Sequence, residues 1–580
     1  MKDEKQDMYR HSMSHVLAKA IKTFYPNAKL AIGPAIDNGF YYDFDNLNIT
    51  PEDFDKIEEK MKSIIANNED FTRKEVSKTE ALEMFVDEPY KIELINELPS
   101  NEKITVYYTG NDFYDLCRGP HVENTKFLRG FAFKINRVSG AYWRGSEKNK
   151  MLTRIYVYGF LNKDDLKECL RIEAEAKERD HRKLGKELGI FMMSDLVGKG
   201  LPMWLPKGFI IRRELSDYII DKEIALGYQH VMTPSLGNVN LYKTSGHWEH
   251  YKDDMFPVME RDDEAYVLRP MNCPHHMMIY KNFMHSYRDL PLRLAEVAND
   301  FRFEASGSLC GIERTRAFTQ NDSHIFCRPD QIEEEIEGVI KLILGVYKDF
   351  GFKDYSFRLS LRDRENVEKY FANDELWEKS ENALRNILKK SGASFYEAVG
   401  EAAFYGPKID VQVKTALGHE VTLSTVQLDY QLPERFELEY IDENDKRVRP
   451  VVIHRAILGS LDRFIAFIIE ETKGVLPAWL SPVQVKILTV NEHNVDYANN
   501  IAERLKKIGI RVENDLSNES VGKKIRSAVI EKAPFILVLG DKEMNEKTVA
   551  VRKRGSKDTS SMSYEEFEQE LTKAIKDKTL

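Results

Sequence analysis

The sequence predicts a multidomain α+β protein in which helices and mostly antiparallel strands build several separate cores. Its 580 residues exceed what one hydrophobic core usually organises, and roughly three or four domains are expected. The middle of the chain carries several strand-like runs with few helices between them, which is typical of an antiparallel sheet. The end of the chain alternates strand-like and helical runs, which is typical of a small α/β domain.

The chain divides into four consecutive parts. Residues 1–160 mix short helices and strands and end in the aromatic-rich runs GAYWRG and RIYVYGF. Residues 161–189 are highly charged, rich in helix-forming residues and without proline, which indicates a solvated linking helix. Residues 190–480 are expected to hold the antiparallel sheet, with helices on one side of it. Residues 481–580 are expected to form the α/β domain, with a largely parallel sheet.

Individual elements can be placed within the last two parts. A helix is expected near Phe209–Ala225, stopped by Gly227 and followed by the extended run YQHVMTPSL. Strands are expected at FRLSL, KIDVQVKTAL, EVTLSTVQLDY and RPVVIHR. In the last part, VKILTV, IRVEND and PFILVLG alternate with helices, and TVAVRKRG precedes a final amphipathic helix.

Composition and charge narrow the class of protein. The 42% hydrophobic and 31% charged residues are ordinary for a globular chain, the charged start shows no signal peptide, and no apolar run could cross a bilayer. The net charge of −10 argues against bulk electrostatic binding of nucleic acid but allows local basic patches. Scattered cysteines fit a reducing compartment, and we expect the cytoplasm. They are Cys117, Cys169, Cys273, Cys310 and Cys327.

The segment from Arg302 to His324 gathers the most chemistry in one place. The run RTRAFTQ follows a Gly/Ser turn and is expected to be a strand, so that Arg314, Arg316 and Phe318 share one face. A face with cations and an aromatic ring suits a polyphosphate joined to a base. The alternative is an edge hairpin whose arginines are merely solvated.

Two further patterns in the central part suggest ligand binding. Cys273, His324 and His454 are residue types that suit a zinc ion with an open fourth position, although their wide spacing equally allows a buried thiol and two hydrogen-bonded core histidines. In HRAILGSLDRF the chain is expected to turn at Gly459-Ser460 into a helix that carries Arg463 on its first turn. A helix start favours anions, but an arginine there is also common on plain surfaces.

The first part carries two pairs of candidate ligands. His11 and His15 share one helix face, and Cys117 and His121 flank a turn at Gly119-Pro120. The four side chains can form a tetrahedral zinc site, can line a metal-free hydrolytic pocket in which imidazoles position a water, or can be incidental. Polar contacts from nearby residues are expected from Tyr42, Lys91 and Asp115.

A basic run near the end, VAVRKRG, places Arg552 and Arg554 on one face of a strand. This pair can contact a nucleic acid, or it can belong to an exposed edge strand that charge keeps soluble.

Taken together, these segments resemble threonyl-tRNA synthetase, a class II aminoacyl-tRNA synthetase, over nearly the whole chain. The central matches are MNCPHH with Cys273, FRFE with Arg302 and Glu304, RTRAFTQNDSHIF with His324, AFYGPKID with Tyr405 and Lys408, STVQLD with Thr425 and Gln427, and IHRAILGSLDRF with His454, Ser460 and Arg463. HSMSH, IDNGFYYD and YDLCRGPHV resemble the family's editing domain, and GDKE and VAVRKRG its anticodon-binding domain.

The resemblance implies a role for each matching residue. Cys273, His324 and His454 would hold one zinc ion per subunit. ATP, with Mg²⁺, would be bound by Arg302, Glu304, Arg314, Phe318, Gln427, Ser460 and Arg463, with Phe318 under the adenine and Arg302 and Arg463 at the phosphates. Threonine would contact Met271, Gln320, Asp322, Tyr405 and Thr425. Transfer to tRNA(Thr) would involve His247, and Pro234 implies a homodimer. Arg552 and Arg554 would meet the anticodon.

The chemistry agrees with this resemblance. Threonine must be told from valine, which lacks the hydroxyl, and a site built to bind the hydroxyl rejects valine strongly. Serine keeps the hydroxyl and lacks only a methyl group, which is worth about 1–3 kcal/mol. A second site must therefore hydrolyse seryl-tRNA(Thr), and the resemblance favours the hydrolytic interpretation of His11, His15, Tyr42, Lys91, Asp115, Cys117 and His121.

The sequence departs from the family in three places. Thr422 stands where some relatives have Gln, and Asn545 stands where an acidic residue is frequent, so one active-site contact and one base contact are expected to differ. Relatives often carry a ubiquitin-like domain before the editing domain, and this sequence starts without one, either because it was removed or because the natural protein lacks it.

Two other functions fit parts of the pattern. A binding paralogue would keep the fold and bind RNA without charging it, but it would be expected to lose nucleotide contacts such as Arg302, Phe318 and Arg463, all of which are present. A trans-acting deacylase would not need the nucleotide-binding hairpin. An aminoacylation assay distinguishes all three.

Overall fold

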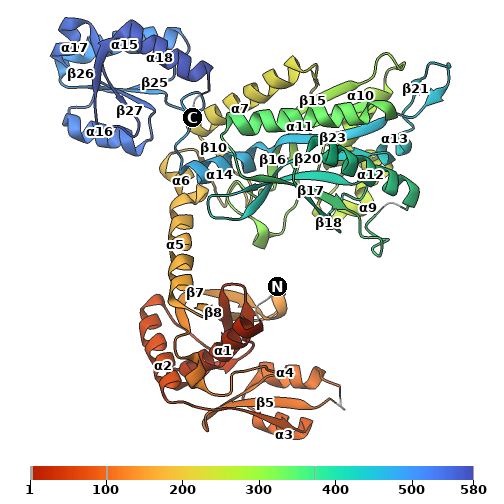
Figure 1. Cartoon of the computed structure of the whole chain (residues 1–580), viewed down its shortest axis with the longest axis vertical. Helices are drawn as coiled ribbons and strands as arrows, with labels where there is room; N and C mark the ends of the chain where they lie inside the picture. The colour runs from red at the N-terminus through yellow and green to blue at the C-terminus, as the bar shows by residue number, and fades with distance from the viewer. Residues whose placement is uncertain (1–3, 100–101, 371, 579–580) are drawn as a thin grey trace. The chain divides into compact units, whose positions relative to one another are not determined.

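The computed structural model describes residues 4–99, 102–370 and 372–578. The chain forms two compact units, residues 1–175 and residues 176–580 (Figure 1). The expectation of a multidomain α+β protein is confirmed, because each unit combines helices with sheets that are mostly antiparallel. Among the described residues, we find no helix with the length and hydropathy that a membrane span requires.

The first unit is built around one long helix and a small sheet. Apolar residues of α1 (Glu4–Phe24) recur every three or four positions, and Met13, Val16, Leu17 and Ile21 are fully buried against the sheet. The sheet has the order β1-β3-β8-β7, with β2 on β3, and α2 packs beside α1. Their bounds are β1 (Lys29–Leu30), β2 (Ala35–Ile36), β3 (Gly39–Asp45), α2 (Phe54–Ala66), β7 (Ala132–Tyr142) and β8 (Met151–Phe160).

A second, three-stranded sheet completes this unit. Its order is β4-β5-β6, and all its pairs are antiparallel. The elements are β4 (Phe71–Val76), α3 (Lys78–Met84), α4 (Pro89–Glu97), β5 (Ile104–Thr109) and β6 (Phe113–Leu116). β6 leads directly into the turn that carries Cys117 and His121, so this sheet brings both residues to the buried face of α1.

The linking segment forms two helices instead of one. α5 (Lys163–Arg179) buries none of its residues, as expected of a solvated helix. Asp180 then leaves the helical conformation, and its carboxylate accepts a hydrogen bond from the Arg182 backbone at the start of α6 (His181–Glu187). α6 buries His181 and Leu184, so the end of the linker belongs to the core of the second unit.

The second unit is organised by an eight-stranded sheet. Its order is β11-β15-β16-β23-β20-β19-β17-β18, and only the outermost pairs, β11/β15 and β17/β18, are parallel. The strands are β11 (Gln229–His230), β15 (Leu292–Phe301), β16 (Ala317–Cys327), β17 (Tyr355–Leu361), β18 (Phe395–Val399), β19 (Lys408–Lys414), β20 (Glu420–Asp429) and β23 (Val451–Ser460). The four strands expected from sequence are thus confirmed, whereas only two residues of YQHVMTPSL join the sheet.

Helices α7 (Pro206–Ala225), α11 (Ile332–Asp349), α12 (Asp374–Ser391) and α14 (Leu461–Thr472) bury their apolar faces against this sheet. α7 matches the helix expected near Phe209–Ala225. The smaller elements around them are β9 (Phe191–Met192), β10 (Met203–Trp204), β12 (Leu236–Asn238), α8 (Val239–Ser245), α9 (His247–Tyr251), β13 (Met259–Arg261), β14 (Glu264–Leu268), α10 (Cys273–Lys281), α13 (Gln431–Arg435), β21 (Tyr440–Ile441) and β22 (Arg447–Val448).

The last part of the chain folds around a sheet of order β25-β24-β26-β27-β28. The three strands β25, β24 and β26 are parallel, but β27 and β28 pair antiparallel, so the expectation of a largely parallel sheet holds for only part of it. Residues 540–547 join β26 to β27 and residues 554–559 join β27 to β28, and both connections are shorter than the dozen or so residues that a parallel crossover needs. The bounds are β24 (Val485–Thr489), α15 (Val495–Lys507), β25 (Val512–Asp515), α16 (Val521–Ile530), β26 (Phe535–Leu539), α17 (Asp541–Glu546), β27 (Thr548–Lys553), β28 (Ser560–Ser563) and α18 (Tyr564–Lys576).

Candidate active site

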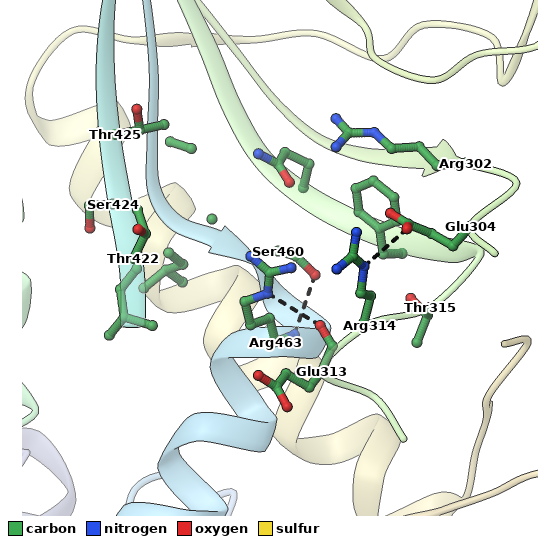
Figure 2. A pocket seen from close by; sticks show the side chains of 16 residues that line it. Arg302, Glu304, Glu313, Arg314, Thr315, Thr422, Ser424, Thr425, Ser460 and Arg463 are labelled. Carbon is green, nitrogen blue, oxygen red and sulfur yellow. Dashed lines mark hydrogen bonds and ion pairs between the residues drawn. The ribbon is translucent and has the colours of Figure 1, made fainter. Parts of the chain in front are cut away.

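A polar pocket of 180 Å³ lies where β16, β20, β23 and the start of α14 meet the loop between β15 and β16 (Figure 2). Its lining includes residues that are far apart in sequence. They are Arg302, Glu304, Glu313, Arg314, Thr315, Phe318, Gln320, Thr422, Leu423, Ser424, Thr425, Ala456, Leu458, Gly459, Ser460 and Arg463. All the residues expected at ATP are in this pocket except Gln427, which lines the adjoining one.

Three guanidinium groups converge on this pocket. Arg302 lies with its guanidinium carbon 5.2 Å from the centroid of the Phe318 ring, and Arg314 pairs with Glu304 at 3.0 Å. Arg463 donates from Nε to the backbone oxygen of Glu313 at 3.2 Å. Burial lowers the pKa of Arg463, and the other two arginines lower it further. Cations held together in this way favour an anion that neutralises their mutual repulsion.

The start of α14 adds backbone donors to the same pocket. Ser460 caps the helix by accepting a hydrogen bond from the Arg463 backbone at 3.3 Å. Gly459 has φ of 60°, and a Cβ there would lie 2.8 Å from the backbone oxygen of Leu423, so the turn from β23 into the helix requires glycine. The turn and the helix start expected from sequence are therefore confirmed, and this helix end favours anions.

Arg316 does not belong to the pocket, contrary to expectation. β16 begins only at Ala317, so Arg314 and Arg316 precede the strand and do not follow its alternation. The Arg316 guanidinium lies over the Phe303 ring and donates two hydrogen bonds to the backbone oxygen of Glu304. Arg314 and Phe318 thus face the pocket, while Arg316 fixes the loop.

A second cavity of 660 Å³ adjoins the first and shares Arg302, Gln320, Thr425 and Arg463 with it. It contains all five residues expected at threonine, namely Met271, Gln320, Asp322, Tyr405 and Thr425. Gln427 also lines it and accepts a hydrogen bond from the Tyr405 hydroxyl. The larger polar cavity thus lies directly beside the pocket on which the three guanidinium groups converge.

Cys273, His324 and His454 meet at the wall of this second cavity. Cys273 is the first residue of α10, and His324 and His454 are directly paired across β16 and β23. All three are buried, and one potential ligand atom from each lies within 4.8 Å of the others. Strand pairing and a helix start therefore gather three residues that are separated by 51 and 130 positions in the sequence.

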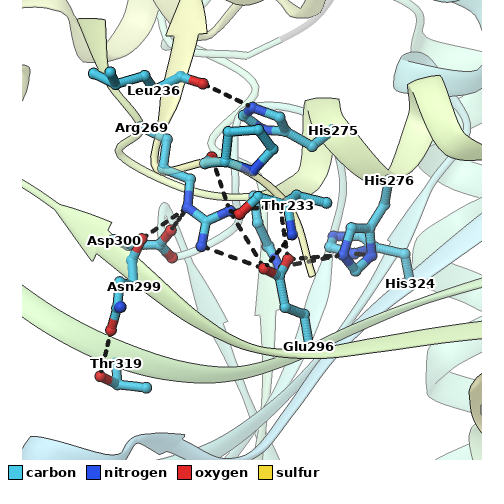
Figure 3. A network of polar contacts seen from close by, with 12 residues as sticks. Thr233, Leu236, Arg269, His275, His276, Glu296, Asn299, Asp300, Thr319 and His324 are labelled. Atoms are coloured by element: carbon cyan, nitrogen blue, oxygen red, sulfur yellow. Dashed lines mark hydrogen bonds and ion pairs between the residues drawn. The ribbon is translucent and has the colours of Figure 1, made fainter. Parts of the chain in front are cut away.

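Further hydrogen bonds orient the imidazoles of His324 and His454. Those around His324 are drawn in Figure 3. His324 Nδ1 lies 2.9 Å from Nδ1 of His276, whose Nε2 contacts Glu296 at 3.2 Å. His454 Nε2 contacts Asp429 at 2.9 Å. The remaining ring nitrogens, His324 Nε2 and His454 Nδ1, are buried with no hydrogen-bond partner in the described structure. Such an arrangement fits a metal ion, because ligating histidines use their other nitrogen to bind an orienting group.

Sequence reasoning missed His276 and Glu296. The signal was present in MNCPHH, since His276 is three residues after Cys273 and lies on the same helix face. Glu296 carried no local signal. It accepts a hydrogen bond from the Thr233 backbone and lies near Arg269 and Asn272, all of which are distant in sequence or on another element.

His247, expected to act in transfer, is fully buried behind the cavity. Its ring contacts those of Phe404 and Tyr405, with centroids 5.4 Å and 6.4 Å away. Nδ1 lies 2.8 Å from the hydroxyl of Ser245. Burial lowers the pKa of His247 to about 3, so the ring is neutral near pH 7.

The first unit gathers its own cluster of nucleophilic and basic groups. His11, His15, Cys117 and His121 place one atom each within 4.8 Å of one another. The Cys117 sulfur lies 3.2 Å from His11 and 3.1 Å from His121, and Ser12 lies 3.2 Å from the other nitrogen of His121. The turn at Gly119 has φ of 74°, as the Gly-Pro sequence predicts.

Burial keeps this cluster uncharged, and an ion pair lies beside it. Burial lowers the pKa of His11, His15 and His121, and raises that of Cys117 to about 12. Beside them, the Asp115 carboxylate accepts a hydrogen bond from Tyr42 and pairs with Lys91 at 2.6 Å. Neutral imidazoles next to an ion pair can position a water molecule by hydrogen bonds.

The departures noted in the sequence fall at the surface and in the pocket. Thr422 lines both cavities and accepts a hydrogen bond from Gln412 at 2.6 Å, while Asn545 is exposed on α17.

Arg552 lies on β27, which runs between β26 and β28, so the alternative of an edge strand is wrong. Arg554 follows the strand and donates to the backbone oxygen of Lys532 at 3.0 Å.

Comparison with known protein families agrees with this geometry. Residues 256–472 match the family described as tRNA synthetase class II core domain (G, H, P, S and T). Residues 484–574 match the anticodon binding domain, and residues 104–156 match the threonyl and alanyl tRNA synthetase second additional domain. The three matches occupy different parts of the chain and follow one another in the order expected from sequence.

Individual relatives match nearly the whole chain. A threonine–tRNA ligase of Geobacillus sp. (strain WCH70) is 56% identical over 97% of this chain and 88% of its own length, and one of Staphylococcus carnosus is 56% identical over 97% and 87%. A crystal structure described as the RNA binding domain of threonyl-tRNA synthetase from Cryptosporidium parvum is 37% identical, with a TM-score of 0.66, over 68% of this chain and 98% of its own. The chain belongs to the threonine–tRNA ligase family of class II aminoacyl-tRNA synthetases.

Proposed function

We propose that the chain activates threonine with ATP, transfers it to tRNA(Thr), and hydrolyses mischarged seryl-tRNA(Thr) in its first unit. The observation that carries the first two steps is the junction of two cavities. One is lined by three guanidinium groups, and the other by Cys273 and His454, which His324 joins in one cluster. An amino acid in one cavity and ATP in the other would meet at Arg302, which lines both. A reaction between a carboxylate and a phosphate is thereby favoured by proximity.

The side chains of the nucleotide cavity suit the attack of a carboxylate on the α-phosphate. Arg302, Arg314 and Arg463 are placed to neutralise charge on the phosphates, together with the Mg²⁺ that accompanies ATP. Phe318 offers a flat face to the adenine, and Glu304 and Gln427 offer polar groups beside it. Ser460 shapes the helix start that faces the anion.

The second cavity would recognise threonine through its amino and hydroxyl groups. Cys273, His324 through Nε2 and His454 through Nδ1 would hold a zinc ion, whose chemistry when bound is that of a Lewis acid for those two groups. Asp322, Gln320 and Tyr405 would accept from or donate to the same groups, while Met271 and Thr425 enclose the side chain. His247 would act from behind Tyr405 in the transfer step.

The cavity is expected to activate threonine and serine but to reject valine. In pyrophosphate exchange, valine should be poorer than threonine by roughly 10⁴-fold, because it leaves the polar groups unpaired, whereas serine should lose only about 10–200-fold. Measuring kcat/KM for the three amino acids tests the proposal. Equal use of valine and threonine, or the absence of any threonine-dependent exchange, would reject it.

The first unit supports proofreading by its cluster of neutral imidazoles and a thiol. His11, His15 and His121 would position the attacking water, with Asp115, Lys91 and Tyr42 holding the groups around it. We favour this over a bound zinc, because Cys117 is already hydrogen-bonded to two of the imidazoles and burial favours its thiol form.

Changing His15 to alanine should slow hydrolysis of seryl-tRNA(Thr) by roughly 100-fold, since a misplaced reacting group costs on the order of 10²-fold in rate. Threonine activation should stay within about twofold, because the activation site lies in the other unit. Hydrolysis of pre-formed seryl-tRNA is the measurement, and His11→Ala is expected to act in the same direction. The exposed His493→Ala serves as a control that should hydrolyse normally.

Further parts of the proposal concern the whole molecule. A homodimer is supported by exposed apolar side chains on α7, α10, β12 and the loops nearby, namely Ile224, Leu226, Met232, Leu236, Met278, Phe283 and Met284. The last part of the chain would bind the anticodon through Arg552 and Arg554.

We also propose the division into residues 1–160 for editing, 161–189 for the linker, 190–480 for catalysis and 481–580 for anticodon binding. Five cysteines without disulfides favour a cytoplasmic location.

A further inference from the structure

The wall of the nucleotide cavity includes a tight turn between Cys310 and Arg314. These two residues exchange both backbone hydrogen bonds, each at 3.1 Å, and the side chain of Ile312 at the tip is fully buried. Glu313 offers its backbone oxygen to Arg463, and Arg314 projects into the cavity (Figure 2). The position of this turn therefore sets the position of two arginines that face the nucleotide.

His181 contacts the backbone of this turn. The Ile312 backbone N–H donates to His181 Nε2 at 3.2 Å. His181 Nδ1 lies 2.7 Å from a carboxylate oxygen of Glu470, which also accepts from the His181 backbone at 3.2 Å. Since Nε2 must accept, the proton is on Nδ1. A Cβ added to Gly311 would lie 2.2 Å from His181 Nε2, so the imidazole touches the backbone of the turn directly.

The partner of His181 belongs to the helix that carries Arg463. Glu470 is near the end of α14, and Arg463 is on its first turn. The neighbouring Arg179, the last residue of α5, donates to the backbone oxygens of Glu470 and Glu471 at 2.9 and 2.8 Å. The start of α14 thus holds the turn at Glu313, through Arg463. The end of α14 holds it at Ile312, because Glu470 binds His181 and His181 accepts from Ile312.

A metal site is the other use to which these residue types could be put. Asp180, His181 and Glu470 place potential ligand atoms within 4.8 Å of one another. However, both ring nitrogens of His181 are already engaged, and the Asp180 carboxylate is bound by the backbone and the guanidinium of Arg182. The hydrogen bonds account for the cluster without an ion.

We propose that His181 is a positioning residue for the ATP site, and that it holds the turn Cys310–Arg314 in the geometry that ATP requires. The first residue of α6, at the end of the linker, therefore forms part of the support of the activation site. The inference rests on the proposed function in so far as ATP is the ligand of the cavity. It assigns to the linker a role beyond joining the two units of the chain.

The test compares one substitution that keeps a hydrogen-bond acceptor with one that removes it. His181→Gln keeps a side-chain oxygen able to accept from Ile312, whereas His181→Leu keeps the bulk without any acceptor. In pyrophosphate exchange, we expect the leucine variant to raise the KM for ATP by roughly 5- to 10-fold, the size of one lost hydrogen bond. The KM for threonine and the zinc content should stay within about twofold. The glutamine variant should recover most of the loss, and the exposed Lys183→Ala should behave as the unchanged protein.

The measurements distinguish a positioning role of His181 from a packing role. If the KM values for ATP and threonine rise together, or if glutamine is as poor as leucine, His181 has only a packing role and the proposal is wrong. Should the leucine variant be insoluble, Glu470→Ala removes the group that holds the imidazole and should raise the KM for ATP alone. Calorimetric titration with a non-hydrolysable ATP analogue gives the same comparison without turnover. A protein that binds the analogue but shows no exchange would reject the proposed function and leave this inference standing.

Discussion

Replacing Cys273 with alanine is expected to abolish threonine activation and to leave the protein with little or no zinc. The substitution removes one of three buried ligand atoms, and the two imidazoles that remain cannot form a three-ligand site. Loss of an orienting group alone costs ~10–100-fold in metal affinity or activity, and loss of a ligand should cost at least about 100-fold. Elemental analysis and threonine-dependent pyrophosphate exchange measure the two effects. The unchanged protein should contain about one zinc per chain.

Cys169 offers a matched control for this experiment, because it is a half-buried thiol on α5, outside both cavities. Cys169→Ala should keep both zinc and activity. Full exchange activity in Cys273→Ala would contradict the assigned metal role, and so would a normal zinc content. If Cys273→Ala loses zinc while His324 and His454 keep their hydrogen bonds to His276 and Asp429, then His276 and Asp429 orient the two imidazoles but do not bind the metal themselves.

The second large effect is expected from Arg463→Ala, which should lower kcat/KM for ATP by roughly 100-fold. One hydrogen bond to a charged group contributes ~1.5–3 kcal/mol, and Arg463 also donates to the Glu313 backbone that shapes the cavity. Arg463→Lys keeps the charge but not the planar fork, and should recover only part of the loss. Steady-state pyrophosphate exchange with varied ATP is the measurement.

Arg213→Ala is the control for this prediction, because Arg213 is exposed on α7 and pairs only with Glu214 among the contacts described. It should leave kcat/KM unchanged. If Arg463→Ala raised the KM for threonine as much as that for ATP, the assignment to the phosphates would be wrong. Burial lowers the pKa of Arg463, yet a guanidinium stays charged throughout the usable pH range, so no pH dependence is expected from this group.

The local elements could be derived from sequence to a large extent. Strands β17, β19, β20 and β23, helix α7, and the turn into α14 follow from alternation, apolar spacing and a glycine at a position that requires it. Such signals are local, because a side chain's place in a strand or helix is set by its near neighbours. Two expectations about where a strand or a helix extends were wrong. Arg316 precedes β16, and the linker breaks at Asp180, where a side-chain cap outweighs helix propensity.

The candidate site residues were identified by their chemistry and by family resemblance, not by spacing. Nothing in the sequence separates Cys273, His324 and His454 from a buried thiol and two core histidines, since the distance between them is a property of strand order. The structure brings them together, but their roles remain predictions. The contacts of Glu296 and Asp429 with the histidines, and the contact of His181 with the turn, could not be derived from the sequence for the same reason. His276 alone carried a signal, in its spacing from Cys273.

By itself, the sequence determined the family of this protein, the types of its local elements and the kinds of groups available for chemistry. Only the tertiary structure decided which ring nitrogens face a common point, which arginine lies outside the nucleotide cavity, and which linker residue contacts the turn in its wall. Hydrogen bonds and metal-ligand distances depend on atoms a few ångströms apart, and residues separated by a hundred positions reach that distance only through the packing of the whole sheet.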